Sequence, residues 1–257
     1  MDEPFLLFAA VGFLAQLVDG ALGMAYGVVS SSVLLAMGVS PAAASASAHA
    51  AEVFTTAASA GSHAWHRNVN WRLFWRLAPA GVVGGVLGAY LLTTFEGDVL
   101  RPFVAAYLGL MGCYILYRVY SGSGQYADQK AHTTIPLGTV GGFMDAVGGG
   151  GWGPVVTTAL VGTGGAPRES IGTVNTAEFF LTLAISAAFL IALITGHWEE
   201  SEGLSHHLTA VLGLIVGGLC AAPLAGYVVK IVPPRRLQLA VGILIVILAI
   251  YQTSRLI

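Results

Sequence analysis

Apolar blocks alternate with short polar segments along the whole chain. Four blocks come before a polar linker and four after it, at residues 4–37, 42–64, 77–95, 102–120, 135–163, 170–197, 207–230 and 237–254. Most blocks are close in length to the span of about 20 residues that an α-helix needs to cross a lipid bilayer. The pattern therefore predicts an all-α integral membrane protein.

Composition agrees with this interpretation. Of the 257 residues, 56% are hydrophobic and 9% are charged, and the mean hydropathy is +0.77. A soluble domain carries about 25% charged residues. Because so few charges do not cover a water-exposed surface of this size, we expect the lipid bilayer to be the solvent. We expect no separate soluble domain and no nucleic-acid partner.

The second group of blocks repeats the first. At an offset of 126 residues, Asp19 aligns with Asp145 and Glu52 aligns with Glu178, without a gap. The same offset aligns Gly23 with Gly149, Gly27 with Gly153, Pro41 with Pro167 and Phe54 with Phe180. We therefore divide the chain into a first membrane repeat (1–120), a linker (121–134) and a second membrane repeat (135–257). Transporters are often built from two such repeats.

The polar segments differ in charge between the repeats. Between the second and third blocks, the first repeat has Arg67, Arg72 and Arg76, and the second has Glu199, Glu200 and Glu202. Between the third and fourth blocks the signs exchange, with Glu96, Asp98 and Arg101 against Lys230, Arg235 and Arg236. Since cytoplasmic loops are enriched in Lys and Arg, equivalent loops are predicted on opposite sides of the membrane. The repeats are predicted to be inverted, and the linker 121–134 is predicted to be cytoplasmic.

The first block of each repeat contains a break. Its centre reads DGALGMAYG from Asp19 in the first repeat and DAVGGGGWGP from Asp145 in the second. Glycine costs about 1 kcal/mol and proline about 3 kcal/mol within a helix, so these blocks are predicted to be broken or re-entrant. Inversion requires an odd number of crossings per repeat, so the four blocks of each repeat are expected to contain three or five. With the broken or re-entrant first segments, we expect about 8–10 membrane segments in total. Irregular backbone at membrane depth is tolerated where it is buried in protein or lines a cavity, so the breaks indicate the site.

Four carboxyl groups lie near these breaks. Asp19 and Asp145 start them, and each is interpreted either as a proton or cation site or as a cap that holds the broken turn together. Glu52 and Glu178 follow on the next block. Burial disfavours their charged form, which suits a proton relay, and the alternative is a hydrogen-bond partner that fixes the repeat interface. Glu52, Glu178 and Asp145 are the predicted proton-coupling residues.

Polar and small residues around the breaks are candidates for substrate binding. Hydroxyl groups and free backbone N–H groups at the start of a half-helix favour an oxyanion, and the alternative is helix packing by small residues. A helix would also place His49 on the face of Glu52, and Asn175 on the face of Glu178. The predicted substrate-binding residues are Asp19, Tyr26, Ser30, Ser31, His49, Gly149, Gly150, Trp152, Thr157 and Asn175. We predict no metal site, cofactor or catalytic residue.

Two segments of the chain resemble the repeated signature of the TauE/SafE family, also called the TSUP family. They are Val11–Glu52 (VGFLAQLVDGALGMAYG…VSPAAASASAHAAE) and Val140–Glu178 (VGGFMDAVGGGGWGPVV…GGAPRESIGTVNTAE). The resemblance implies a bacterial or archaeal plasma-membrane permease for sulfur-containing anions such as sulfite, organosulfonates and thiosulfate. The matching motif positions are Asp19, Gly27, Pro41, Glu52, Asp145, Gly149, Gly153, Pro154, Pro167, Asn175 and Glu178. The first repeat departs from the second in having LGMA in place of four glycines, and His49 in place of Asn175.

The residues and the resemblance lead to one functional prediction. The chain is expected to be a secondary transporter in the bacterial inner membrane that moves sulfite or an organosulfonate such as sulfoacetate. Protons are the expected coupling ion, and alternating access is expected at the interface of the two repeats. A homodimer is one arrangement that the sequence permits.

Two other classes of protein remain as alternatives. A channel or carrier for metal ions or other cations would use the same four carboxyl groups. An intramembrane enzyme would need a nucleophile with a base, or a set of metal ligands, and no such group is arranged on one helix face. We therefore predict that the chain is not an enzyme.

Overall fold

The computed structural model describes the chain except for residues 1–2, 122–129, 164, 199–203, 232 and 256–257. Within the described residues the secondary structure is helical throughout. The first half contains α1 (Glu3–Leu22), α2 (Tyr26–Ala36), α3 (Pro41–Trp65), α4 (Trp71–Thr94) and α5 (Gly97–Ser121). The second half contains α6 (Ala131–Gly148), a π-helical turn η1 (Gly153–Thr157), α7 (Thr158–Gly162), α8 (Pro167–Ile194), α9 (Leu204–Ile231) and α10 (Pro234–Ser254).

Local sequence explains several helix starts. The Ser40 side chain accepts a hydrogen bond from the Ala43 N–H at 3.2 Å, and Pro41 occupies the first position of α3. The Asn70 side chain caps α4 by accepting from the Leu73 N–H at 3.0 Å. Such caps satisfy N–H groups that have no partner inside the helix.

The cap at Asn70 corrects one sequence-based boundary. The apolar block was placed at residues 77–95, with Arg72 and Arg76 in the preceding polar segment. Because Asn70 starts the helix earlier, both arginines lie in the first two turns of α4. Arg101 likewise lies inside α5 rather than in the segment before it.

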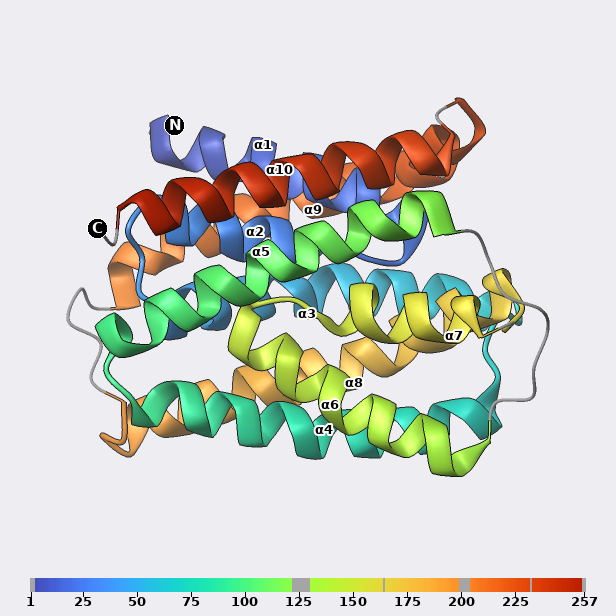
Figure 1. Cartoon of the computed structure of the whole chain (residues 1–257), viewed down its shortest axis with the longest axis horizontal. Helices are drawn as coiled ribbons and strands as arrows, with labels where there is room; N and C mark the ends of the chain where they lie inside the picture. Colours follow the sequence, from blue (N-terminus) through green and yellow to red (C-terminus); the bar gives the residue numbers. More distant parts are fainter. Residues whose placement is uncertain (1–2, 122–129, 164, 199–203, 232, 256–257) are drawn as a thin grey trace.

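The long helices run along the longest axis of the molecule, and their connections gather at its two ends (Figure 1). At one end, here named the basic end, α3 joins α4 and α9 joins α10. At the other end, named the acidic end, α2 joins α3 and α4 joins α5. Corresponding helices of the two halves run in opposite directions, as α5 and α10 show.

The two halves are interlocked. The most extensive contacts are those of α1 with α9 and of α4 with α6, which are the same pair with the halves exchanged. The central helices α3 and α8 pack on each other, as do α5 and α10. The predicted repeat boundaries, 1–120 and 135–257, therefore divide the sequence but not the core.

The first block of each half is broken where the glycine-rich sequences predict it. Gly23 has φ +66° and Ala25 has φ +103°, and α2 then returns toward the end at which α1 begins (Figure 1). Gly149 and Gly150 have φ +67° and +152° between α6 and η1. L-residues with a Cβ rarely adopt such values, which accounts for glycine at three of these four positions.

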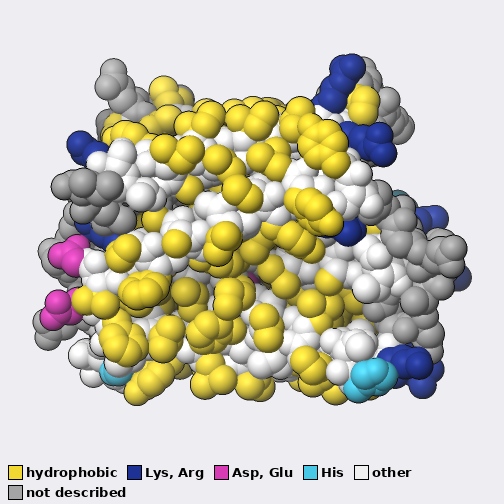
Figure 2. Space-filling model, in the orientation of Figure 1, with side chains coloured by type: hydrophobic (Ala, Val, Ile, Leu, Met, Phe, Trp, Pro, Cys, Tyr) yellow, Lys and Arg dark blue, Asp and Glu magenta, His cyan; other side chains and the backbone are white. Residues whose placement is uncertain are grey.

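Apolar side chains cover the middle of the molecular surface, and charged side chains lie toward the two ends (Figure 2). Among the described residues, three helical stretches are long and apolar enough to cross a membrane: Trp71–Thr94, Gly97–Ser121 and Arg168–Ile194. Shorter apolar stretches occur in other helices, as in Pro4–Gly20 and Gln238–Ser254. The number of full crossings, predicted as about 8–10 segments, stays a prediction.

Candidate functional site

The backbones of the two breaks touch at the centre of the molecule. A Cβ atom on Gly150 would overlap the backbone of Gly27 and Val28. A Cβ atom on Gly153 would lie 2.6 Å from the Met24 Cα. Met24 aligns with Gly150 and Gly27 with Gly153, so the second contact repeats the first with the halves exchanged. Glycine is required at these positions because no side chain fits between the two backbone segments.

Hydroxyl groups join the two breaks. The Ser31 Oγ donates to the Gly148 carbonyl at 3.1 Å, and the Thr157 Oγ1 donates to the Gly23 carbonyl at 3.2 Å. Both hydroxyl hydrogens are thus engaged by the opposite half. By contrast, the buried hydroxyl of Ser30 has no hydrogen-bond partner among the described residues, nor has that of Ser32. These two hydroxyls have the donor that a ligand would need.

Asp145 holds the second break together. Its Oδ1 accepts from the Gly151 N–H at 2.6 Å and from the Trp152 N–H at 2.8 Å. Its Oδ2 lies 3.1 Å from the His49 Nε2, and both side chains are buried. This geometry matches the capping role that the sequence left open, and it adds an ion-pair partner from the other half.

The His49 ring has a partner on each of its two nitrogens. Its Nδ1 lies 2.8 Å from the Ser45 carbonyl oxygen, which only accepts, so Nδ1 is the donor in that contact. Its Nε2 lies 3.1 Å from the Asp145 Oδ2, and this contact joins α3 to the end of α6.

The first break is held by fewer bonds. Asp19 is buried, and its recorded hydrogen bond, from the Tyr26 N–H, is long at 3.5 Å. Asn175 occupies the position equivalent to His49, but its Nδ2 donates to the Ser59 Oγ at 3.0 Å. The Asn175 Oδ1 is buried and has no partner among the described residues.

The two glutamates complete a group of four buried carboxyl groups. Glu52 and Glu178 are each 3% exposed, and one carboxyl oxygen of each has no partner in the described part of the chain. Glu178 interacts electrostatically with the other three carboxyl groups. Because burying an unpaired carboxylate is very unfavourable, these oxygens require a proton, water or a ligand.

The aromatic residues at the starts of the returning helices have structural partners. The Tyr26 hydroxyl donates to the Leu214 carbonyl at 2.9 Å, and the Trp152 Nε1 donates to the Val174 carbonyl at 3.1 Å. Both rings are buried. They fix the breaks against α9 and α8.

The structure thus brings the predicted site residues together at the crossing. The sequence-based selection omitted Ser45 and the pair Thr56 and Thr182. Ser45 is four residues before His49, a spacing that places both on one helix face and that offered a signal. Thr56 and Thr182 are equivalent in the repeat, and their hydroxyl oxygens lie 3.4 Å apart. Equivalent positions on the two central helices are natural candidates for such contacts.

No group of three or more His, Cys, Asp or Glu side chains that could hold a metal ion occurs among the described residues.

Comparison with known proteins identifies the family of the chain. The family model described as "Sulfite exporter TauE/SafE" matches residues 8–252. A relative from Bacillus subtilis (strain 168), described as "Probable membrane transporter protein YtnM", is 44% identical over 249 residues. The match covers 93% of this chain and 79% of the relative. No solved structure matches the chain. Because the family match spans nearly the whole sequence, the chain is a membrane transporter, not an enzyme, and belongs to the TauE/SafE family.

Proposed function

We propose that the chain is a secondary transporter that moves a small sulfur-containing anion, sulfite or an organosulfonate such as sulfoacetate, coupled to protons. The family description names sulfite export. The observation that carries the proposal is the group of four buried carboxyl groups at the crossing of the two breaks, of which Glu52 and Glu178 each have one oxygen without a partner among the described residues. Intramembrane carboxyl groups are rare and commonly mark ion or proton pathways.

A carboxyl-rich site binds an anion when its groups carry protons. A protonated carboxyl group donates a hydrogen bond, whereas a carboxylate repels the substrate. Binding of the anion and of the proton then favour each other, which is the thermodynamic requirement for coupled transport. The free hydroxyl of Ser30, which lies on the same face of α2 as Gly27, supplies a further donor, and the start of α2 supplies a favourable helix dipole.

The His49–Asp145 pair offers a proton store beside this site. The His49 Nε2 and the Asp145 Oδ2 are 3.1 Å apart, and Glu52 interacts electrostatically with Asp145. A proton that moves from this pair to a glutamate changes the charge that the substrate meets. We infer that Asp145, Glu52 and Glu178 act together in coupling.

Alternating access at the interface of two inverted repeats follows from the proposal. The exchanged helix contacts and the opposite helix directions support inversion (Figure 1). The basic end is tightly closed: the Arg168 Nε donates to the Asn68 Oδ1 at 2.7 Å, and the Asn70 N–H donates to the Thr173 Oγ1 at 2.8 Å. At the acidic end, a hollow of about 600 Å³ lies between Ser40 and His197. The residues that line this hollow do not include those of the crossing, so the hollow supports an entrance at the acidic end and not an open path to the site.

The proposed orientation places the basic end in the cytoplasm of a bacterium. Lys and Arg near the ends of helices are enriched on the cytoplasmic side. The linker 121–134, predicted to be cytoplasmic, lies mostly outside the described residues. Its last four residues, 131–134, belong to α6, and the end of α5 and the start of α6 that flank it lie at the basic end.

Uptake into proteoliposomes tests the proposal. Labelled sulfite and sulfoacetate are supplied with and without an imposed pH gradient, to the wild type and to Glu52→Gln and Glu178→Gln variants. Saturable uptake that follows the pH gradient in the wild type, and loses this response in the variants, is the expected result. Uptake in the variants that still follows the gradient would overturn the coupling role of the glutamates.

The cation reading has one observation in its favour. The ionisable groups buried at the crossing are carboxyl groups and His49, with no Lys or Arg among the buried described residues. The same liposomes distinguish the two functions. If folded protein takes up neither anion but conducts a divalent or monovalent cation, a cation carrier or channel replaces the anion transporter.

A further inference from the structure

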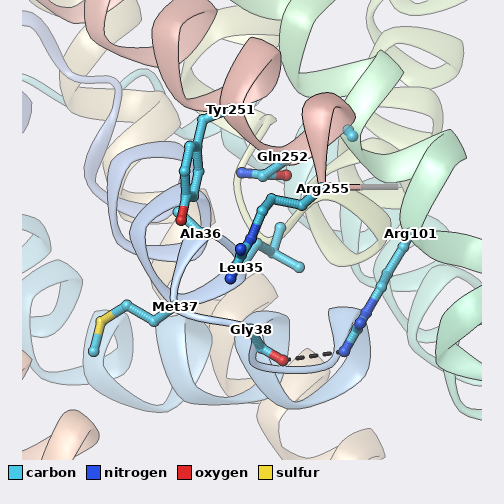
Figure 3. Close-up of a pocket in the computed structure, with 9 residues that line it drawn as sticks. Leu35, Ala36, Met37, Gly38, Arg101, Tyr251, Gln252 and Arg255 are labelled. Atoms are coloured by element: carbon cyan, nitrogen blue, oxygen red, sulfur yellow. Dashed lines mark hydrogen bonds between the residues drawn. The ribbon is translucent and has the colours of Figure 1, made fainter. Parts of the chain in front are cut away.

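A second polar site lies away from the crossing, at the acidic end. It is a pocket of about 320 Å³ between the end of α2, the start of α5 and the end of α10. In Figure 3, Arg101 from α5 and Arg255 from the end of α10 extend toward residues 35–38 from two different helices. Gln252 and Tyr251 form the adjoining wall.

The distribution of basic residues singles out this pocket. The chain has eleven Lys and Arg residues. Nine lie in connections or helix ends that face the basic end: Arg67, Arg72, Arg76, Arg118, Lys130, Arg168, Lys230, Arg235 and Arg236. The remaining two, Arg101 and Arg255, both line the same pocket at the acidic end. Two like charges at one small pocket repel each other unless an anion neutralises them.

The two guanidinium groups retain free donors. Arg101 donates from Nη2 to the Gly38 carbonyl at 3.0 Å, while its buried Nε has no partner among the described residues. Its other charged neighbour is Asp98, at 3.6 Å, whose side chain is 90% exposed and therefore a weak partner. The Arg255 guanidinium group lies 5.8 Å from the Tyr251 ring centre and makes no hydrogen bond or ion pair with the described residues.

Helix ends explain part of this arrangement, because a cation at the C-terminus of a helix stabilises the unpaired carbonyls there. Arg101 does this for α2 through Gly38. Arg255 follows the last residue of α10, but its guanidinium group makes no hydrogen bond to a carbonyl of the described residues and extends toward the pocket (Figure 3). No carboxyl group is among the residues that line the pocket. The forked geometry of guanidinium groups fits the oxygens of a small oxoanion.

We propose that this pocket is a binding site for a small oxoanion, held by Arg101 and Arg255 against the end of α2. Oxoanions of sulfur and phosphorus share the required chemistry. The anion would lie at the C-terminal end of α2, the same short helix that carries Ser30 and Ser32. That the bound anion is the one transported rests on the proposed function, whereas the existence of the site does not.

Binding to the full-length protein in detergent tests the site. Sulfate, sulfite and inorganic phosphate are titrated calorimetrically into the wild type and into Arg255→Gln and Arg101→Gln variants. We expect each variant to weaken binding by about tenfold or more, because one charged hydrogen-bonding group is lost. Arg255→Lys keeps the positive charge but lacks the forked guanidinium group, so its effect on binding affinity should be intermediate.

One control separates this site from general charge. Arg118→Gln removes the guanidinium that lies against Gly162 at the end of α7, the counterpart position at the basic end. Binding is expected to persist in Arg118→Gln. Binding that is unchanged in both Arg101→Gln and Arg255→Gln would overturn the proposal.

A lipid headgroup is the other source of an oxoanion. Nanodiscs with phosphatidylglycerol are compared with nanodiscs of phosphatidylcholine, and lipid retained by the purified protein is quantified. Phosphatidylglycerol retained by the wild type and lost in Arg255→Gln would assign the site to a headgroup. Absence of both free-anion and anionic-lipid binding would overturn it.

The oxoanion site and the proposed transport function can fail independently of each other. If the wild type takes up no sulfur anion but Arg255→Gln still abolishes oxoanion binding, the site survives and the proposed substrate fails. If uptake occurs and Arg255→Gln leaves both binding and the KM for uptake unchanged, the site fails and the proposed function survives.

Discussion

The two breaks begin with the same residue type at equivalent positions, yet their carboxyl groups are held differently. Asp145 accepts two short backbone hydrogen bonds and pairs with His49 from the other half. Asp19 accepts one long bond, and Asn175, which replaces His49, bonds elsewhere. The second break is thus fixed by charge and hydrogen bonds, whereas the first leaves a buried carboxyl group with bonding capacity to spare.

This difference teaches that duplicated sequence does not imply duplicated function. A carboxyl group with short bonds to the backbone is held in one position, while one with a single long bond is free to bond to a ligand. We infer that Asp145 takes part in coupling from a fixed position, whereas Asp19 contacts the substrate. Each prediction below tests one part of this asymmetry.

The largest effect is expected from Gly150→Ala. The new methyl group would overlap the backbone of Gly27 and Val28, and φ +152° is unfavourable for alanine, so we expect little folded protein. At Gly23, where φ is +66°, alanine meets mainly the Ile171 side chain, and a loss of about 1–2 kcal/mol is expected. Yield in size-exclusion chromatography and the Tm measure both. A Gly150→Ala protein that unfolds near the wild-type temperature would contradict the close crossing.

Next comes removal of the two aspartates. Asp145→Ala leaves two N–H groups and His49 without partners, so unfolding should become easier by about 3–5 kcal/mol. Asp19→Ala loses one long hydrogen bond, and about 1 kcal/mol is expected. Thermal unfolding in one detergent compares them. Equal shifts in Tm would remove the structural basis of the asymmetry.

A smaller effect, on activity alone, is expected from Asp19→Asn. Asparagine keeps the size of the side chain but gives up the exchangeable proton, so sulfite uptake should fall by about tenfold at unchanged Tm, as for the loss of one charged hydrogen bond. Asp145→Asn is the matched comparison: its amide group can still accept from Gly151 and Trp152 and donate to His49, so the Tm should hold while the response of uptake to the pH gradient is lost. Uptake by Asp145→Asn that still follows the pH gradient would contradict its role in coupling.

The smallest effects should be symmetric. Ser31→Ala and Thr157→Val each remove one hydroxyl bond between the breaks, with lengths of 3.1 Å and 3.2 Å. Each should destabilise the protein by about 1 kcal/mol. Similar shifts in Tm are expected, and the double variant should show about their sum. A large difference between the two would mean that the asymmetry extends beyond the aspartates.

The sequence predicted the breaks well because their cause is local. Runs of glycine and a proline next to Asp145 disfavour a helix whatever the tertiary structure, and the structure breaks both blocks at these places. The start of α4 was missed because Asn70 caps it, and a single polar side chain leaves little trace in hydropathy.

The partners of the carboxyl groups were not predictable in the same way. His49 and Asp145 are 96 residues apart, and their contact exists only because the halves cross. Nothing local distinguishes His49, which finds a carboxyl group, from Asn175, which finds Ser59. The alternatives left open by the sequence, a cap or a proton site for each aspartate, are separated only by bonds between distant segments.

The packing of α1 on α9 and of α4 on α6 has a consequence for the order in which the molecule can fold. The most extensive contacts of α1 and α4 are made with helices of the other half, so both stay without their main partners until α6 and α9 have been synthesised. We therefore expect the first half, produced alone, not to reach a stable fold.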